Sequence, residues 1–282
     1  MVSMNKEIKI KYSESKDTIN MSKDQFVNLF LIDIVINGNP IPLLFDTGGS
    51  KTVIRKSLAE KMSLSVLSDS VKAGGNTGKI ETFSTGVIPI LKVGNNSISN
   101  LNVIIVPDSQ LDFGFDEEGN SLKINGVLGW DVISSFKWVI DPHTRTYSIE
   151  KPKANKSKEL LYWDNMPIIN VKYDNRQMYF GFDSGNTESM FSKEFIPLMM
   201  KTKKERIDKI AGINEMLEEE VYLLESIKIN ISNKDIVLNN ISVLKRDIFP
   251  AKEFKVMGLL AADIIQNHKC VIDFTNNEFQ LI

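Results

Sequence analysis

The chain has almost no cysteine, little histidine and no long apolar run. Its 282 residues include one cysteine, Cys270, and two histidines, His143 and His268. A lone cysteine cannot form an internal disulfide, which excludes the small disulfide-stapled scaffolds. The sequence contains no His-Glu-x-x-His pattern, and we expect neither a metal nor another cofactor. No stretch reaches the roughly 18–20 consecutive apolar residues that a membrane-spanning helix needs.

A strong charge of either sign is also missing. The formal net charge is −2 and no segment concentrates basic residues, so we expect no nucleic-acid partner. With 42% hydrophobic and 25% charged residues the composition is that of an ordinary globular protein. The excess of Asn, Lys and Ile is typical of AT-rich bacterial genomes. The length is sufficient for one large domain or two of ordinary size.

The first 21 residues are polar and lack the apolar core of a signal peptide. A chain from which a leader had been removed would look the same, so the location stays open between the cytoplasm and a secreted or periplasmic site. The alternation of Glu7 to Tyr12 favours a strand, with a propeptide and an unstructured tail as the alternatives. We treat residues 1–21 as a polar N-terminal extension.

Two short turns stand out among the remaining residues. Apolar residues 43–45 run into Asp46-Thr47-Gly48, and residues 179–182 run into Asp183-Ser184-Gly185. Glycine lets the backbone approach a neighbour closely in such a turn, and the hydroxyl can form a hydrogen bond across to a second turn. A single Asp-Ser-Gly is usually a surface turn, so its meaning depends on what surrounds it.

An internal repeat surrounds both turns. A shift of 183 − 46 = 137 positions superposes the two aspartates, and a shift of 258 − 126 = 132 superposes residues 126–133 on 258–265. The shift drifts only by loop-sized amounts, which indicates two related halves. We assign them to residues 22–150 and 163–282, joined by a polar, basic linker at 151–162.

Each half consists mostly of predicted short strands, which places the chain in the all-β class. The expected strands are 30–36, 41–45, 87–93 and 101–106 in the first half, and 168–173, 177–180, 227–231 and 241–244 in the second. Short helices are expected at 57–62 and 193–200. Two more are expected after the repeated glycine-rich segments, with Asp131 and Asp263 as N-caps.

Two Asp turns related by a two-fold axis would bring their carboxyl groups within a few ångströms of each other. Such carboxyls cannot both ionise easily, so they share one proton. The ionised member can take a proton from a water that attacks a peptide carbonyl, while the protonated member donates to the carbonyl oxygen. This chemistry requires no metal and no covalent intermediate.

The chain therefore resembles the retropepsin-like (retroviral-type) aspartic proteases, over residues 28–150 and 166–282. Val127-Leu128-Gly129 matches the family's second motif, and residues 258–261 match it less well. The resemblance implies two fused β-barrel halves in a bilobal, pseudo-two-fold fold, and a monomer acting on a peptide or protein substrate. It implies the following site residues: catalytic Asp46 and Asp183; supporting Thr47, Gly48, Ser184 and Gly185; and the flap residues Gly74, Gly75, Asn76, Gly78, Gly212, Ile213 and Asn214.

The second half departs from the first in two ways. Ala261 stands where the first half has Gly129, and the second flap is acidic at residues 218–220. We hypothesise that this acidic flap favours substrates with basic residues. A helix across 204–226 is an alternative to a flap hairpin there, because the segment is rich in helix-forming residues.

Other repeated or reactive residues have structural explanations. Asp141 and Asp273 precede expected turns, and residues 107–125, which lack the ligand spacing of a calcium site, are expected to form a solvated loop. Cys270 is expected in the core, and the three tryptophans are expected to pack: Trp130, Trp138 and Trp163. The main alternative function is a peptide-binding or regulatory module that keeps the fold with weak or no hydrolysis.

Overall fold

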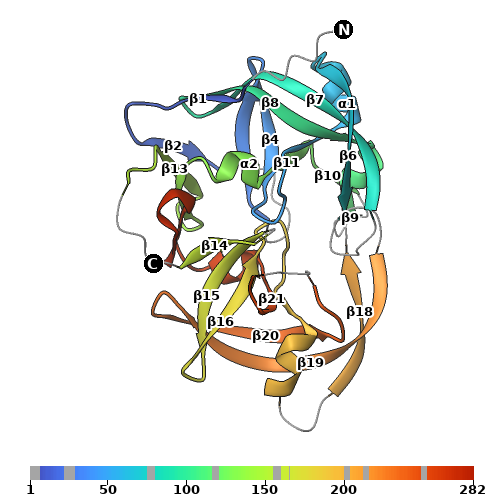
Figure 1. Cartoon of the computed structure of the whole chain (residues 1–282), viewed down its shortest axis with the longest axis vertical. Helices are drawn as coiled ribbons and strands as arrows, with labels where there is room; N and C mark the ends of the chain where they lie inside the picture. The colour runs from blue at the N-terminus through green and yellow to red at the C-terminus, as the bar shows by residue number, and fades with distance from the viewer. Residues whose placement is uncertain are drawn as a thin grey trace.

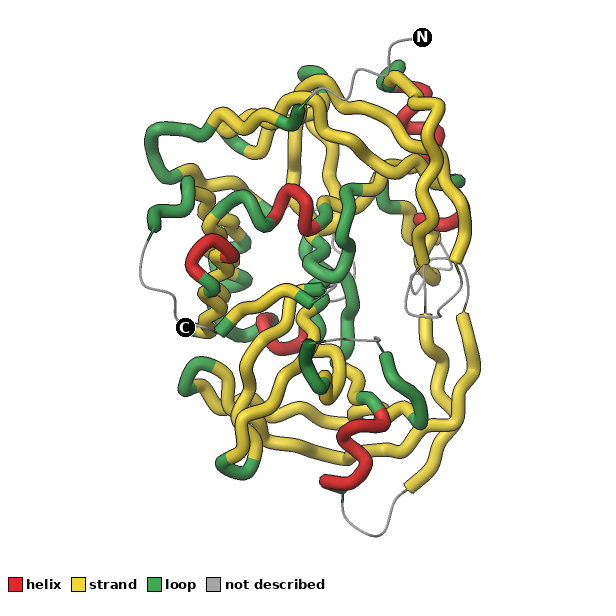
Figure 2. The backbone as a smooth tube through the Cα atoms, in the orientation of Figure 1, coloured by secondary structure: helices red, strands yellow, loops and turns green. Residues whose placement is uncertain are grey.

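The computed structural model describes most of the chain. The described residues are 7–21, 29–74, 80–115, 121–154, 160–164, 166–199, 204–211, 216–248 and 253–282. Figure 1 shows two lobes stacked along the long axis, the N-terminal lobe above the C-terminal one. Strands dominate both lobes, and the helices are short (Figure 2). Among the described residues, no helix is long and apolar enough to cross a membrane.

The first lobe is built on an eight-stranded sheet in the order β1-β8-β5-β11-β4-β3-β7-β6. An additional pairing between β7 and β8 closes this sheet into a barrel. Its elements are β1 (Lys9–Lys11), β3 (Leu31–Ile36), β4 (Asn39–Phe45), β5 (Val53–Arg55), α1 (Lys56–Lys61), β6 (Ser65–Gly74), β7 (Ile80–Val93), β8 (Asn96–Val106), η1 (Asp108–Leu111), β9 (Asp112–Phe115), β10 (Ser121–Lys123), β11 (Gly126–Leu128) and α2 (Trp130–Ile133).

The second lobe repeats this order of elements. Its sheet runs β14-β15-β16-β21-β17-β20-β19-β18, and an additional pairing between β15 and β19 closes it. Its elements are β14 (Leu161–Trp163), β15 (Pro167–Tyr173), β16 (Arg176–Phe182), β17 (Met190–Phe191), η2 (Lys193–Leu198), β18 (Lys204–Ala211), β19 (Met216–Ile231), β20 (Lys234–Leu244), β21 (Val256–Leu260) and η3 (Ala262–Ile265).

A five-stranded sheet joins the lobes, in the order β2-β13-β12-β22-β23. It consists of β2 (Asp17–Asn20), β12 (Lys137–Asp141), β13 (Thr146–Glu150), β22 (Cys270–Asp273) and β23 (Glu278–Leu281), and η4 (Phe274–Asn276) connects its last two strands. The central pair, β12 and β22, is antiparallel with Val139 opposite Val271. These two valines occupy matching positions in the halves, so a pseudo-two-fold axis passes between them. Cys270 is buried in this sheet, as expected.

The hairpins before the two Asp turns form for the same local reason. Asn37 and Gly38 both have positive φ between β3 and β4, and Asp174 and Asn175 both have positive φ between β15 and β16. Two consecutive residues with positive φ give the turn whose twist matches the twist of paired strands, and Asn, Asp and Gly tolerate it best. The predicted hairpins at these positions are therefore present.

Several sequence expectations are corrected. The alternative helix across 204–226 is absent from the described residues of that segment, which form β18 and most of β19; these strands pair with each other, and β19 also pairs with β20. Asp131 and Asp263 are not N-caps, since Gly129 and Ala261 occupy those positions. The second predicted helix is a 3-10 helix, Lys193–Leu198.

The N-terminal extension and the linker contribute strands. Residues 9–11 pair with β8 and residues 17–20 pair with β13, so the described part of the extension is built into the first lobe and the joining sheet. Leu161, assigned to the linker, is buried and begins β14. We propose that the second domain begins at residue 161, and otherwise keep the predicted division.

Candidate active site

The two aspartates lie at equivalent ends of parallel strand pairs. Strand β4 pairs in parallel with β11, and β16 pairs in parallel with β21. The backbone N–H of Asp46 donates to Leu128 O at 3.1 Å, and that of Asp183 donates to Leu260 O at 2.9 Å. Each turn is thereby anchored to its own lobe where strand pairing ends, and both lie where the lobes meet.

Each turn also packs against the carboxyl group of the other. A Cβ atom on Gly48 would lie 2.3 Å from Cγ of Asp183, and one on Gly185 would lie 2.5 Å from Cγ of Asp46. These gaps are too small for any side chain, so glycine is required at both positions. The structure therefore brings Asp46 and Asp183 face to face, as the repeat predicted.

Thr47 and Ser184 join the turns through four hydrogen bonds. Thr47 Oγ1 donates to Phe182 O at 2.9 Å and accepts from the N–H of Ser184 at 2.9 Å. Ser184 Oγ donates to Phe45 O at 2.7 Å and accepts from the N–H of Thr47 at 3.1 Å. Both hydroxyl residues are fully buried. The pattern is symmetric, and it fixes the position of one carboxyl group relative to the other.

Burial raises the pKa values of both carboxyls, and the charge of Asp46 raises that of Asp183 further. Desolvation raises the pKa of Asp46, and hydrogen bonds from its own turn partly oppose this. Desolvation, followed by the charge of Asp46, raises the pKa of Asp183 well above its usual range. A side-chain hydrogen bond links the two groups. The arrangement favours a protonated Asp183 that donates to an ionised Asp46.

The donors around the two carboxyls differ. Asp46 Oδ1 accepts from the backbone N–H groups of Gly48 and Gly49, at 2.8 and 3.0 Å. Asp183 Oδ1 accepts from the N–H of Gly185 at 2.8 Å, while its Oδ2 accepts from the side-chain amide of Asn186 at 2.9 Å. Asn186 thus supplies a side-chain donor that its counterpart Gly49 lacks.

A second pair of contacts, not predicted from the sequence, braces each turn. Thr52 N and Oγ1 donate to Asp131 Oδ1 at 3.0 and 2.8 Å. In the second lobe, Ser189 N donates to Asp263 Oδ2 at 2.8 Å and Ser189 Oγ to Oδ1 at 2.6 Å.

The sequence contained a signal for this brace. A hydroxyl residue lies six positions after each aspartate of the pair, at Thr52 and Ser189, and Asp131 and Asp263 occupy matching repeat positions. Each hydroxyl also accepts from the backbone of its glycine-rich segment, from Gly129 N at 3.2 Å and Ala261 N at 3.0 Å.

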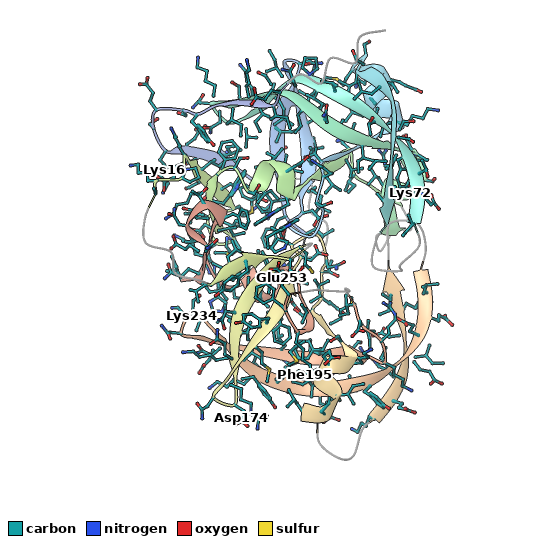
Figure 3. All side chains as sticks on the ribbon, viewed as in Figure 1. Lys16, Lys72, Asp174, Phe195, Lys234 and Glu253 are labelled. Atoms are coloured by element: carbon teal, nitrogen blue, oxygen red, sulfur yellow. The ribbon has the colours of Figure 1, made fainter. Side chains whose placement is uncertain are left out.

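Two long hairpins occupy the positions expected for flaps. They are formed by β6 with β7 and by β18 with β19, seen on the right in Figure 1. Lys72, labelled in Figure 3, lies on the first of them, and Gly74 ends β6. The other predicted flap residues lie outside the described residues: Gly75, Asn76, Gly78, Gly212, Ile213 and Asn214.

The acidic residues of the second hairpin form ion pairs within their own lobe. Glu219 forms a two-point ion pair with Arg246, at 2.7 and 2.9 Å. Lys209 lies 4.0 Å from Glu218, and Lys245 lies 3.0 Å from Glu220. Lys245 also pairs with Glu205 at 2.9 Å, so these cations offset only part of the negative charge of the hairpin, and the preference for basic residues stays a hypothesis.

The remaining side chains do not suggest other chemistry. Within the described residues, no group of three or more His, Cys, Asp and Glu side chains is placed to hold a metal ion. Burial raises the pKa of the Cys270 thiol, which disfavours the reactive thiolate. Trp130 stacks on Trp163 with ring centres 5.9 Å apart, and Trp138 is fully buried. The tryptophans therefore pack as predicted.

Comparisons with known proteins agree with this geometry. The family model described as aspartyl protease matches residues 32–132, which include the Asp46 turn and the Gly129 motif. The crystal structure of the aspartic proteinase from Irpex lacteus is similar with a TM-score of 0.53 and 13% sequence identity, over 95% of this chain and 97% of that one. No curated protein sequence matches the chain.

These comparisons confirm the family resemblance over residues 32–132 and the predicted all-β, bilobal aspartic proteinase fold. At 13% identity, the structural similarity shows the fold alone.

Proposed function

We propose, from the aspartyl protease match over residues 32–132 and the aspartic proteinase fold of the whole chain, that this protein is an aspartic endopeptidase. The observation that carries the proposal is the packing of each Asp turn against the opposite carboxyl group, with Gly48 and Gly185 leaving no space for a side chain. The substrate would be a peptide or protein lying between the two lobes, under the two hairpins.

The two carboxyls divide the reaction between them. Ionised Asp46 takes a proton from a water molecule, and the water oxygen bonds to the carbonyl carbon of the peptide. Protonated Asp183 gives its proton to the carbonyl oxygen, which yields a neutral gem-diol. The proton held by Asp46 then passes to the amide nitrogen, the C–N bond breaks, and a hydroxyl proton of the diol returns to Asp183. Amine and carboxylic acid leave, and the pair regains its single proton.

The donors around the pair support this division of roles. Two backbone N–H groups converge on Asp46 Oδ1 and stabilise its negative charge. Desolvation and the nearby charge of Asp46 keep the pKa of Asp183 raised, so that it can act as the acid. A protein that only binds peptides would gain nothing from two buried carboxyls whose ionisation is mutually unfavourable. The geometry therefore favours the enzyme over the regulatory module.

The direct test replaces each carboxyl separately. We expect Asp46→Asn and Asp183→Asn each to lower kcat/KM by about 10³-fold or more, since each removes an acid or a base. Cleavage of a denatured protein between about pH 3 and 7, analysed by mass spectrometry with and without pepstatin, measures this effect. Asp174→Asn is the control, because Asp174 lies in a distant hairpin turn labelled in Figure 3. Cleavage that survives either dyad substitution would contradict the proposal.

A further inference from the structure

A cavity of about 650 Å³ lies in the second lobe, and its lining begins at Asn186, three residues after Asp183. The segment that follows the Asp183 turn forms one wall, strand β18 a second and strand β20 a third. Asn186 belongs to this lining, and its amide also donates to Asp183 Oδ2 at 2.9 Å. Strand β18 is one arm of the second hairpin. A substrate held between the carboxyl pair and this hairpin would therefore pass the cavity.

The cavity contains a fixed guanidinium group. Arg206 Nη2 donates to Asp208 Oδ2 at 2.9 Å, to Ser242 Oγ at 2.7 Å and to Asn240 O at 3.2 Å. Ser242 Oγ in turn donates to Asp208 Oδ2. All four residues line the cavity. The bonds cross from β18 to β20, so the orientation of the guanidinium is set by two strands rather than left to a flexible surface side chain.

Not every N–H group of this guanidinium has a partner among the described residues. Arg206 Nε is buried and has no hydrogen-bond partner among the described residues. A buried donor left unsatisfied is unfavourable. An oxygen acceptor entering from the cavity would bind the accessible N–H groups of the guanidinium rather than the buried Nε. The Arg206 and Asp208 side chains are 35% and 31% exposed, so a ligand can reach the pair.

The charges around the cavity favour one type of ligand. Arg206 is ion-paired with Asp208, and the lining also contains the exposed Glu188 and the exposed Lys209, which lies 4.0 Å from Glu218. Asp263, also in the lining, accepts from Ser189. A carboxylate ligand would face Asp208, Glu188 and Asp263, and an ammonium ligand would face the Arg206 guanidinium. A neutral carboxamide avoids both conflicts, because its oxygen accepts from Arg206 and its NH₂ group donates to carboxylate or carbonyl oxygens.

We propose that this cavity is the substrate subsite for a glutamine or asparagine side chain, and that Arg206 determines its specificity. The proposal rests on the proposed peptidase function, because it assumes a peptide lying beside the Asp46–Asp183 pair. It assigns the protein a class of substrate: peptides with a carboxamide side chain at one fixed distance from the cleaved bond.

The first experiment measures cleavage by the full chain. Position-scanned peptides locate the site at which glutamine is preferred, and kcat/KM is then compared for peptides that carry Gln, Glu, Lys or the isosteric Met at that site. We expect a preference for Gln of about tenfold or more over each of the others, since a site built for hydrogen bonds rejects analogues that lack them. In Arg206→Met the preference should fall to about threefold or less. Equal rates for all four peptides in the wild type would overturn the proposal.

A matched arginine controls for the loss of an ion pair in this lobe. Arg246→Met removes an arginine that pairs with Glu219, a residue of the hairpin that also carries Arg206. Neither Arg246 nor Glu219 belongs to the cavity lining. This variant should keep the full preference for Gln. Ser242→Ala is a second, smaller change within the cavity and should also weaken the preference for Gln. It tests the proposal if Arg206→Met does not fold. A preference that is unchanged in a folded cavity variant would contradict the proposal.

A binding experiment separates this proposal from the peptidase function. Asp46→Asn is titrated with position-scanned peptides that carry Gln, Glu, Lys or Met, and their dissociation constants are measured by fluorescence competition. If the wild type cleaves no peptide, the peptidase proposal fails, but tenfold tighter binding of the Gln peptide would still support the subsite. If the wild type cleaves peptides and Asp46→Asn binds all four equally, the subsite proposal fails alone.

Discussion

The two lobes share the elements that position the carboxyl groups and differ in what directly contacts them. In both lobes a hydroxyl residue beside the aspartate bonds across to the other lobe, at Thr47 and Ser184. The donor three residues after the aspartate is a backbone N–H alone at Gly49, whereas Asn186 adds its side-chain amide. The comparison teaches that the framework is symmetric while the immediate surroundings of each carboxyl are not. Because these surroundings differ, the proton shared by the pair favours one of the two carboxyl groups.

The joining sheet shows the same combination of symmetry and difference. Lys137 lies 3.4 Å from Glu278 and Lys269 lies 2.8 Å from Asp141, so each lysine pairs with an acid of the other lobe. The two lysines occupy matching repeat positions, but their partners do not. The sheet thus keeps a two-fold arrangement of cross-lobe ion pairs with different partners, and Asp141 has the structural role expected of it.

Breaking the symmetric bonds between the turns should have the largest effect on stability. Thr47→Val leaves Phe182 O and the N–H of Ser184 without partners inside the protein. Each buried group left unsatisfied costs about 1–3 kcal/mol, so we expect a loss of about 2–5 kcal/mol, with a similar loss for Ser184→Ala. Chemical denaturation followed by tryptophan fluorescence measures both losses.

The double variant sharpens this test. Because the four bonds form one network, its loss should fall short of the sum of the single losses by about 1 kcal/mol. Purely additive losses would show that the two hydroxyls act independently.

Exchanging the residues at the glycine-rich segments should have a smaller and unequal effect. A Cβ on Gly129 would lie 2.4 Å from the backbone carbon of Lys51, so Gly129→Ala must displace the loop after Asp46, at about 1–3 kcal/mol. Ala261 is fully buried at the matching position. Ala261→Gly removes only a methyl group and adds backbone freedom to the unfolded chain, so we expect a loss of about 1 kcal/mol of stability. Thermal unfolding of both variants measures the difference, and equal losses would show that the lobes are packed alike here.

The central part of the site could be predicted from the sequence because it depends on local turns and on the repeat. Asp46, Thr47 and Gly48 are adjacent, and the repeat supplies Asp183 as a partner without knowledge of the fold. The Thr52–Asp131 and Ser189–Asp263 braces depend on the antiparallel pairing of β5 with β11 and of β17 with β21. Each pairing joins segments far apart in the sequence, so the matching repeat positions of these four residues do not by themselves predict that the residues meet.

The second hairpin shows how tertiary pairing overrides local preference. Residues 216–220, Met-Leu-Glu-Glu-Glu, favour a helix by intrinsic propensity, yet they form part of β19. That strand is paired with β18 on one side and β20 on the other. The ion-pair partners of Glu219 and Glu220 are Arg246 and Lys245, just beyond β20, and only the folded lobe brings them together.

The smallest predicted effect concerns the one donor that distinguishes the two carboxyls. Asn186→Gly gives the second turn the same residue as Gly49 in the first and removes the amide that donates to Asp183 Oδ2. A donor to a carboxylate stabilises its ionised form, so losing this donor raises the pKa of Asp183 further. In the proposed mechanism Asp183 is the acid and must be protonated, and in this variant it would stay protonated to a higher pH.

The basic limb of the kcat/KM profile should therefore move to higher pH in Asn186→Gly, while the acidic limb, set by Asp46, stays in place. Thr187→Gly is the control, because this exposed neighbour is replaced by the same residue without removing a donor to the pair, and both of its limbs should stay where the wild type has them. A basic limb that stays fixed or moves to lower pH in Asn186→Gly would show that the proton belongs to Asp46 instead, and that the difference between the lobes acts in the opposite direction.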